Sequence, residues 1–274
     1  MEQPFRDRRD AFLRKVRHSA VMGIINVTPD SFFDGGQFHT IEAASAHAHK
    51  LVADGCDIVD IGGESVRPGA TPVSAADELA RIETLVGHLA PTLDVALSVD
   101  TSKARVAARA LALGAVAIND VWGLQQDAAM ADVVAAADAL VVIMHNRHGK
   151  DEALDIMADM RAFFDRSLAL AAKAGIARQH IILDPGIGFA KTSRQNRDAL
   201  ARLDELKDYG LPIMVGVSRK SFLGSLVPGN PEASLIGTVA ANLAAAARGA
   251  TIFRVHDVAE HVAAMKVWRE IHAP

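Results

Sequence analysis

Three polar side chains of this sequence stand directly after short, mostly apolar runs. Asp100 follows Ala-Leu-Ser-Val, Asn119 follows Ala-Ile, and Asp184 follows Ile-Ile-Leu. A carboxylate accepts two parallel hydrogen bonds from a guanidine-like edge, such as that of a 2-aminopyrimidinone ring. A carboxylate and an amide on neighbouring strand ends can satisfy the other donors and acceptors of such a flat heterocycle. For Asp100 or Thr101 taken alone, capping of the next helix is an equally good interpretation.

A second group of side chains is suited to anions. Arg67 lies in the run Gly-Gly-Glu-Ser-Val-Arg-Pro-Gly, two residues after Ser65, and Arg254 and His256 are also two residues apart. That spacing points Arg254 and His256 to the same side of a predicted strand. A guanidinium forks onto the oxygens of a phosphate or carboxylate. These residues therefore predict an anion site, and the alternative for Arg254 and His256 is a basic pair that faces solvent.

Asn26 ends the first apolar run and offers a neutral amide oxygen. Hard cations such as Mg²⁺ bind such an oxygen together with water and substrate phosphate oxygens. For Asn26 alone, an Asx turn before Pro29 is the preferred interpretation. The chain from Asn26 to about Thr40 is longer than the usual ~2–6-residue connection from strand to helix, which is typical of a lid or binding loop.

Several familiar motifs are incomplete. The Gly-x-Gly run at 186–188 lacks the third glycine of a dinucleotide fingerprint and the Gly-Lys-Ser/Thr of a P-loop. Ser218 lacks the second glycine of a nucleophile elbow, which argues against a hydrolase triad. His145 and His148 could reach one metal ion, but no cysteine or carboxylate is placed to complete a site. The sequence therefore offers no protein nucleophile.

The elements that must hold these side chains alternate along the whole chain. Near-continuous apolar runs predict strands, and the alanine-, leucine- and charge-rich stretches between them predict helices that cover a parallel sheet. Eight such pairs favour an α/β fold of the closed (β/α)8 TIM barrel type over an open doubly wound sheet, and the polar strand ends then meet at its catalytic face. The predicted strands are 21–27, 57–61, 96–100, 117–119, 140–144, 181–183, 213–217 and 252–255, and the predicted helices are 41–54, 74–89, 103–113, 126–136, 152–174, 193–207, 232–247 and 258–272.

Composition narrows the possible partners. The 274 residues are 50% hydrophobic and 23% charged, which is enough apolar material for a buried core. A net charge of -4 gives no general attraction to nucleic acid or anionic lipid. The single cysteine excludes an intramolecular disulfide, and the longest uncharged stretch, 233–247, is too short to span a membrane. We expect a cytoplasmic globular protein without nucleic-acid or membrane partners, made of an N-terminal extension at 1–18 and a single barrel domain at 19–274.

Together, these motifs resemble the dihydropteroate synthase family of pterin-binding (β/α)8 enzymes. The most specific runs are Asn-Val-Thr-Pro-Asp-Ser-Phe from Asn26, Gly-Gly-Glu-Ser from Gly62 and Ser-Arg-Lys-Ser from Ser218. The resemblance implies condensation of (7,8-dihydropterin-6-yl)methyl diphosphate with 4-aminobenzoate to 7,8-dihydropteroate, by SN1-like departure of diphosphate assisted by Mg²⁺. It also implies a homodimer. The matching stretches, in the order of the family, are 22–36, 60–70, 98–103, 118–121, 144–145, 183–191, 215–222 and 254–258.

The resemblance also implies a role for each matching residue. The implied pterin contacts are Asp100, Asn119, Val121, Met144, Asp184, Phe189 and Lys220. The implied diphosphate contacts are Asn26, Arg67, Arg254 and His256, with Mg²⁺ on Asn26. The implied 4-aminobenzoate contacts are Phe32, Ser65, Val66, Arg67, Ser218, Arg219 and Lys220. The implied catalytic set is Asp100, Lys220, Arg254 and His256.

Departures from the family pattern leave two alternatives. Val66 stands where threonine is usual, Ala190 stands where glycine is common, and the run after His145 diverges. A methyltransferase of the same fold, acting on a methylated folate, would keep the pterin carboxylates and have no need of the anion set. A non-catalytic pterin-binding or scaffold protein would require the first two loops to be inert, whereas both loop motifs are intact here. Release of diphosphate in the presence of both substrates distinguishes the synthase from either alternative.

Overall fold

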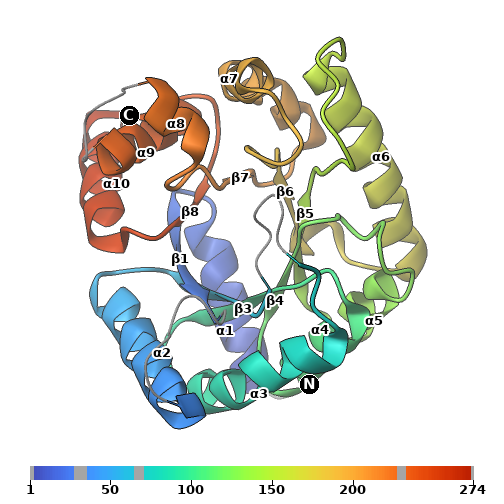
Figure 1. Cartoon of the computed structure of the whole chain (residues 1–274), viewed down its shortest axis with the longest axis vertical. Coiled ribbons are helices and arrows are strands. Elements are labelled where there is room, and N and C mark those ends of the chain that lie inside the picture. Colours follow the sequence, from blue (N-terminus) through green and yellow to red (C-terminus); the bar gives the residue numbers. More distant parts are fainter. Residues whose placement is uncertain (1–2, 28–35, 65–70, 227–232, 273–274) are drawn as a thin grey trace.

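The computed structural model describes residues 3–27, 36–64, 71–226 and 233–272, without the side chains of 36–40, 225 and 233. Eight parallel strands form one sheet in the order β6-β5-β4-β3-β2-β1-β8-β7, which curls into a ring at the centre of the molecule (Figure 1). The ring closes where Leu183 of β6 bridges Ile213, and the Leu183 amide donates to the Pro212 carbonyl at 2.9 Å. The strands are β1 (Ala20–Asn26), β2 (Ile58–Gly62), β3 (Ala96–Asp100), β4 (Ala117–Asp120), β5 (Leu140–Met144), β6 (Ile181–Asp184), β7 (Met214–Val215) and β8 (Ile252–Val255).

Helices surround this ring of strands (Figure 1). Parallel neighbours require a crossover between them, and helices supply it here. The (β/α)8 barrel predicted from the alternation of elements is therefore confirmed. None of the described helices is long and apolar enough to cross a membrane. The helices are α1 (Gln3–Lys15), α2 (Gly36–Ala53), α3 (Ala75–Thr92), α4 (Ala104–Ala112), α5 (Met130–Ala136), α6 (Ile156–Ala174), α7 (Ser193–Ala201), α8 (Ser221–Leu226), α9 (Ala233–Ala246) and α10 (Val258–His272).

The strands are apolar because both of their faces are covered. In β5, Leu-Val-Val-Ile-Met, every residue is buried, and Val142 and Ile143 point to opposite faces. Such continuous apolar runs are typical of parallel sheets between helices and a packed interior. Polar residues gather at the carboxyl ends of the strands, and all of these ends lie on one face of the barrel.

Helix α1 was not predicted from the sequence. Its side chains Phe5 and Phe12 are buried, and the helix packs against β3. Arg9 donates to the backbone oxygen of Asp138 at 2.7 Å and pairs with the Asp138 carboxylate at 2.5 Å, just before β5 begins. The helix therefore covers apolar surface at the amino ends of the strands, opposite to the polar strand ends. The boundary predicted at residue 18 falls between α1 and β1.

Several predicted elements differ from the structure. The helix predicted at 41–54 begins five residues earlier, at Gly36, so the connection after β1 is shorter than predicted, and the strand predicted at 213–217 is only Met214–Val215. The sequence predicted a continuous helix over 193–207, but α7 ends at Ala201 and a 3-10 helix, Leu203–Tyr209, follows it. Leu203 and Leu206 are both buried. Side chains three residues apart lie on the same face of a 3-10 helix, so the tighter winding points both leucines inward. Helix α8 was not predicted either.

Candidate active site

The carboxyl ends of β1 to β4 share a register that aligns polar residues from several strands. Asn26 pairs with Gly62, Gly62 with Asp100, and Asp100 with Asn119. Gly62 leaves open space between its neighbours, since a Cβ built there would lie 3.7 Å from Asn26 Oδ1 and 3.6 Å from Asp100 Cβ. The predicted convergence of strand ends thus places Asn26, Asp100 and Asn119 in one row across a glycine.

Next to this row, two carboxylates share one guanidinium. Arg254 donates from Nε to Asp60 Oδ2 at 2.7 Å and from Nη2 to Asp100 Oδ2 at 2.8 Å. Asn119 donates from Nδ2 to the same Asp60 oxygen at 3.1 Å. The Asp60 side chain is fully buried and that of Arg254 is 18% exposed, so the solvent-facing alternative for Arg254 is wrong. We name Asp60, Asp100 and Arg254 the arginine-bridged cluster.

Several hydrogen-bond acceptors in and beside this cluster remain open. Within the described part of the chain, Asp60 Oδ1, Asp100 Oδ1, Asn119 Oδ1 and Ser98 Oγ are buried without a partner. Burial raises the pKa of Asp100 to about 7; the Arg254 charge opposes this rise and the Asp60 charge adds to it. A buried acceptor without a partner costs about 1–3 kcal/mol. The row is therefore complementary to a ligand that presents N–H groups.

The helix-capping alternative is wrong for Asp100, whereas Thr101 Oγ1 accepts from the Lys103 amide at 3.2 Å, just before α4. Helix α4 starts after Lys103, which makes no side-chain capping bond. The first amide of the helix, Ala104 N, donates to Asp127 Oδ2 at 2.8 Å. Because Asp127 caps this amide, the Asp100 carboxylate remains available for the site.

Asp184 ends β6 on the other side of the barrel mouth. Its side chain is 4% exposed, and Oδ1 accepts a 2.7 Å hydrogen bond from the Gly186 amide. Burial raises the pKa of Asp184 to about 6; the Gly186 bond and the longer-range charge of Lys220 oppose the rise. Met144, its register neighbour on β5, is buried. A carboxylate beside an apolar side chain is suited to a flat ring with paired N–H donors.

Lys220, between β7 and α8, approaches the loop that follows Asp184. Its Nζ lies 4.2 Å from the centroid of the Phe189 ring, a cation–π contact. A Cβ built at Gly188, where φ is +87°, would lie 2.9 Å from Lys220 Cδ, so this approach requires glycine. Burial lowers the pKa of Lys220 to about 8. We name Asp184, Phe189 and Lys220 the loop cluster.

Other predicted site residues occupy different surroundings. His256 Nδ1 lies 2.9 Å from Ser218 Oγ, and that oxygen accepts from the His256 amide at 3.1 Å. Val121, just after β4, is 6% exposed. Arg219 has φ +56°, and its guanidinium pairs with Asp257 at 2.5 Å while the side chain is 55% exposed. The structure thus joins Ser218 to His256 and holds the Arg219 guanidinium at Asp257.

The remaining predicted site residues, Phe32, Ser65, Val66 and Arg67, lie outside the described residues. The flanks of the second loop are described. Glu64 Oε1 accepts from the Val73 amide at 2.8 Å, and Glu64 Oε2 pairs with Lys103 at 2.6 Å. One carboxylate therefore ties both flanks of this loop to the segment that follows β3.

Comparison with known proteins decides the family. The sequence model of a family described as "Pterin binding enzyme" matches residues 22–256. The dihydropteroate synthase of Bacillus subtilis (strain 168) is 43% identical over 238 residues, which cover 87% of this chain and 83% of that protein. The chain belongs to the dihydropteroate synthase family of pterin-binding enzymes.

Solved structures of the dihydropteroate synthase family share the whole fold. A Clostridium difficile dihydropteroate synthase crystallised in the presence of pteroic acid is 44% identical, with a TM-score of 0.91, and the match covers 94% of this chain and 98% of that one. A Xanthomonas albilineans dihydropteroate synthase with 4-aminobenzoic acid is 43% identical, with a TM-score of 0.90, and the match covers 94% and 95%. The family resemblance seen in the motifs is confirmed.

Two residues that the sequence analysis left unassigned contact the candidate site residues or the loop beside them. Asp60 shares Arg254 with Asp100, and its position inside an otherwise apolar strand was a signal that could have found it. Lys191, only 2% exposed, contacts the loop after Asp184. A lysine seven residues beyond a strand end gives no sequence signal of burial, because its partners are backbone oxygens of the loop and the distant His145 ring.

Metal ligation by histidine has no support in the described part of the chain. There, no group of three or more His, Cys, Asp or Glu side chains is placed to hold a metal ion. His145 contacts Asp159 and Lys191, whereas the His148 ring lies 4.5 Å from the Trp122 ring. The two histidines therefore face different partners.

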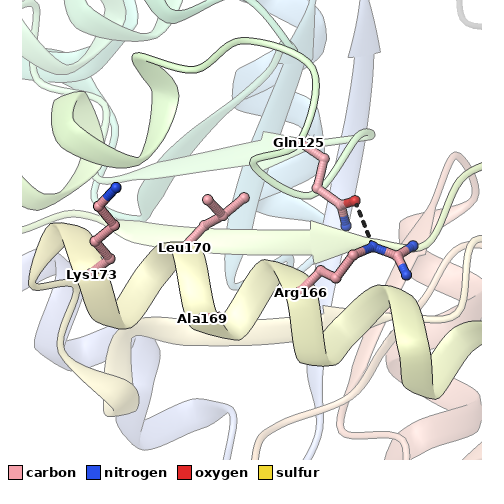
Figure 2. A pocket seen from close by; sticks show the side chains of 5 residues that line it. All are labelled: Gln125, Arg166, Ala169, Leu170 and Lys173. Carbon is pink, nitrogen blue, oxygen red and sulfur yellow. Dashed lines mark hydrogen bonds between the residues drawn. The ribbon is translucent and has the colours of Figure 1, made fainter.

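A surface hollow lies along α6, beside Gln125 of the loop that follows β4 (Figure 2). Gln125 Oε1 accepts there from Arg166 Nε at 3.3 Å. The lining is aliphatic, amide and cationic, so it supplies neither a carboxylate nor a nucleophile to the site at the barrel mouth. The lining residues are Gln125, Arg166, Ala169, Leu170 and Lys173.

Proposed function

We propose that the protein catalyses the condensation of (7,8-dihydropterin-6-yl)methyl diphosphate with 4-aminobenzoate, giving 7,8-dihydropteroate and diphosphate, a transferase step of folate biosynthesis. The observation that carries the proposal is a pair of buried carboxylates, Asp100 and Asp184, both with raised pKa values, at the mouth of one barrel. The open acceptors beside Asp100 add to it. Membership of the dihydropteroate synthase family supports this chemistry.

The loop cluster is suited to the pterin ring. Asp184 would accept from the ring N3–H and the 2-amino group, which is the bidentate pattern of a carboxylate on a guanidine-like edge. Lys220 would donate to the ring carbonyl on the same side. Asn119 and Asp100 would accept from the opposite edge with oxygens that have no partner in the described chain. Met144 and Phe189 would form apolar walls against the faces of the ring.

The arginine-bridged cluster is suited to hold the diphosphate end. A guanidinium has five N–H donors, and Arg254 uses Nε and one Nη2 hydrogen on its two carboxylates. Its remaining N–H groups can bind phosphate oxygens without release of Asp60 or Asp100. His256 and Ser218, next along the same barrel mouth, would complete this side together with Arg67 from the second loop.

Charge balance supports Mg²⁺ as the cofactor. With both acids ionised, Asp60, Asp100 and Arg254 together carry a net negative charge, which repels a diphosphate unless a further cation is present. Mg²⁺ keeps several waters and takes one or two protein oxygens plus substrate phosphates, so the Asn26 amide oxygen beside Gly62 fits it without a cage of carboxylates. When bound, the ion supplies charge neutralisation for the departing diphosphate.

The reaction then requires no protein nucleophile. The bond between the pterin methylene carbon and the diphosphate oxygen breaks, and the electron pair leaves with diphosphate. The resulting cation is delocalised into the electron-rich dihydropterin, where the ionised Asp100 stabilises it. The neutral amine of 4-aminobenzoate forms the new carbon–nitrogen bond and releases one proton to solvent.

A coupled assay for diphosphate release tests the proposal. We expect release only when the pterin diphosphate, 4-aminobenzoate and Mg²⁺ are all present, and a sharp fall in rate when a chelator removes the metal. A methyltransferase would release no diphosphate, and a binding protein would only titrate with pterin. Either result would contradict the synthase.

We further propose that the protein is a cytoplasmic homodimer. Support comes from large apolar side chains exposed on two neighbouring helices: Ile236 on α9 is 56% exposed, and Val267 and Ile271 on α10 are 60% and 71% exposed. Burial of such side chains against a second copy would remove apolar surface from water. Sedimentation velocity at micromolar concentration measures the mass, and a monomer there would contradict the dimer.

A further inference from the structure

The loop between β6 and α7 has an unusual backbone. Gly186 has φ +63°, Gly188 has φ +87° and Ala190 has φ +42°. The left-handed region is easy for glycine and costs about 1 kcal/mol or more for a residue with a Cβ, such as Ala190. The loop that follows Asp184 and carries Phe189 therefore does not hold this shape by backbone preference alone.

The ammonium group of Lys191 lies inside the turn of this loop. Lys191 Nζ donates to Gly186 O at 2.8 Å and to Phe189 O at 3.3 Å. The side chain is buried, and a Cβ built at Gly186 would lie 3.3 Å from the Nζ and 2.0 Å from the backbone oxygen of His145. The loop is thus folded tightly around one cation and against the end of β5.

A histidine connects this cation to a carboxylate on α6. Lys191 Nζ lies 2.8 Å from His145 Nδ1, and His145 Nε2 lies 3.0 Å from Asp159 Oδ2. An ammonium has only donors, so Nδ1 accepts from Lys191 and Nε2–H donates to Asp159. His145 is fully buried, and burial lowers its pKa to about 4, so the ring stays neutral between its two charged partners.

The chain of three side chains stabilises a charge that burial disfavours. Burial lowers the pKa of Lys191 to about 7; Asp184 and Asp159 favour its charged form, and Lys220 and Arg147 oppose it. Asp159, which also pairs with Arg147 Nε at 3.2 Å, is 26% exposed and thus retains its charge at low cost. Polarisation through the neutral imidazole extends the effect of that charge to Lys191.

We propose that Lys191, supported by His145 and Asp159, is a positioning residue for pterin binding, because its ammonium fixes the loop that carries Phe189 and whose Gly186 amide orients the Asp184 carboxylate. The proposal rests on the proposed function, since the pterin site is what the loop presents. Lys191 and Lys220 hold this loop from different positions. Lys220 contacts it at Gly188 and Phe189, where the ligand would lie, whereas Lys191 binds its backbone oxygens.

The central test is Lys191→Met, which keeps the length of the side chain and removes every donor. We expect the dissociation constant for the pterin alcohol, which lacks the diphosphate, to rise about tenfold or more in calorimetry, because four acceptors lose one buried ammonium. The KM for the pterin diphosphate should rise in parallel, with the KM for 4-aminobenzoate within about twofold of wild type. Lys173→Met, on the exposed side of α6, is the matched control and should change neither constant.

Asp159→Asn provides a milder change that leaves the buried residues in place. We expect it to weaken pterin binding severalfold, in the same direction as Lys191→Met. Because both substitutions act through one chain of contacts, the double variant should bind pterin no more weakly than Lys191→Met alone. Full additivity of the two effects would overturn the connection through His145.

The outcomes separate this inference from the proposed function. Wild-type protein that releases no diphosphate from the two substrates contradicts the function before any variant is measured. Given an active wild type, pterin binding within twofold of normal in both variants, with only a lower melting temperature, would overturn the positioning role. If Lys191→Met does not fold, Asp159→Asn alone decides, and normal pterin affinity in that variant would overturn the inference.

Discussion

The arginine-bridged cluster and the loop cluster hold their buried carboxylates in opposite ways. Asp60 and Asp100 contact Arg254 directly, at 2.7 and 2.8 Å. Asp184 has a backbone amide at 2.7 Å, and Lys220 acts on it only through longer-range charge. In the first cluster one guanidinium partly offsets the charge of two carboxylates, whereas Asp184 has a single backbone hydrogen bond that opposes its desolvation.

The difference corresponds to the two ends of the proposed substrate. A pterin ring is neutral and offers N–H donors, so a carboxylate without a cation at hydrogen-bond distance can pair with it fully. A diphosphate is an anion, and it requires a guanidinium whose position is already fixed by other partners. Under the proposed function, Asp184 would therefore only bind the pterin, whereas Asp60 and Asp100 would also orient the arginine that binds the diphosphate.

The largest effect should follow Asp184→Asn. The amide presents one acceptor where the ring offers two donors, and the charge that strengthens both bonds is lost. We expect pterin affinity, measured by calorimetry, to fall about a hundredfold, in line with ~3 kcal/mol for an unmatched buried donor. Asp198→Asn, on the exposed face of α7, is the control. Unchanged pterin affinity in Asp184→Asn would remove Asp184 from the pterin site.

Arg254→Gln tests the other cluster. We expect affinity for the diphosphate-bearing pterin to fall roughly thirtyfold, about 2 kcal/mol. Affinity for the pterin alcohol, which lacks the diphosphate, should fall only a few times. The variant should also unfold more easily, because Asp60 and Asp100 lose a buried cation. Arg109→Gln, whose partner Glu83 is exposed, is the matched control. Equal losses for the two ligands would place Arg254 away from the diphosphate.

The pH dependence of the free energy of unfolding tests how Asp184 is held in the loop cluster. The pKa of Asp184 in the folded protein, about 6, lies above its ordinary value of 3.8, so its ionised form opposes folding. This penalty is absent below pH ~3.8, where the acid is neutral in both states, and is complete above pH ~6. Ligand-free Asp184→Asn should therefore be more stable than wild type at pH 8, with a smaller difference at pH 4.5. Denaturant unfolding of both proteins checks this, and a difference independent of pH would contradict it.

The smallest effect should follow Val66→Thr. Valine stands in the second loop where the family usually has a hydroxyl, and this position lies outside the described residues. A neutral hydrogen bond contributes about 0.5–1.5 kcal/mol, so the KM for 4-aminobenzoate should fall modestly. Pterin affinity should stay the same, since neither cluster is altered. A severalfold rise in that KM would show that the site has adapted to the methyl group.

The polar residues at the strand ends could be predicted from the sequence, because their signals lie close together in the chain. An apolar run followed by Asp100, Asn119 or Asp184 marks where a strand leaves the core, and parallel strands bring all such points to one face. The apolar run of a strand and the polar residue that ends it are adjacent in the sequence, so this prediction requires no knowledge of contacts between distant residues. Strand positions and the family motifs follow from such local patterns.

Contacts between residues far apart in the chain could not be predicted from such local patterns. The contacts of Arg254 with Asp60, of Lys191 with His145 and of Arg9 with Asp138 join residues far apart in the chain. Arg9 also shows why α1 was missed, because its helix gains stability from packing on the barrel rather than from its own pattern. The break after Ala201 has the same origin, since buried leucines select the 3-10 geometry.

The narrow closure of the ring has a consequence for ligand binding. β7 is only Met214–Val215, and the seam between β6 and β7 is held by the bridge at Leu183. Asp184 follows Leu183 directly, and Lys220 follows β7. Under the proposed function, a pterin bound between Asp184 and Lys220 would contact both sides of this seam and so stabilise its closed form. By thermodynamic linkage, a change that stabilises the closed seam would then also raise the affinity for pterin, and bound substrate would add to the stability of the barrel.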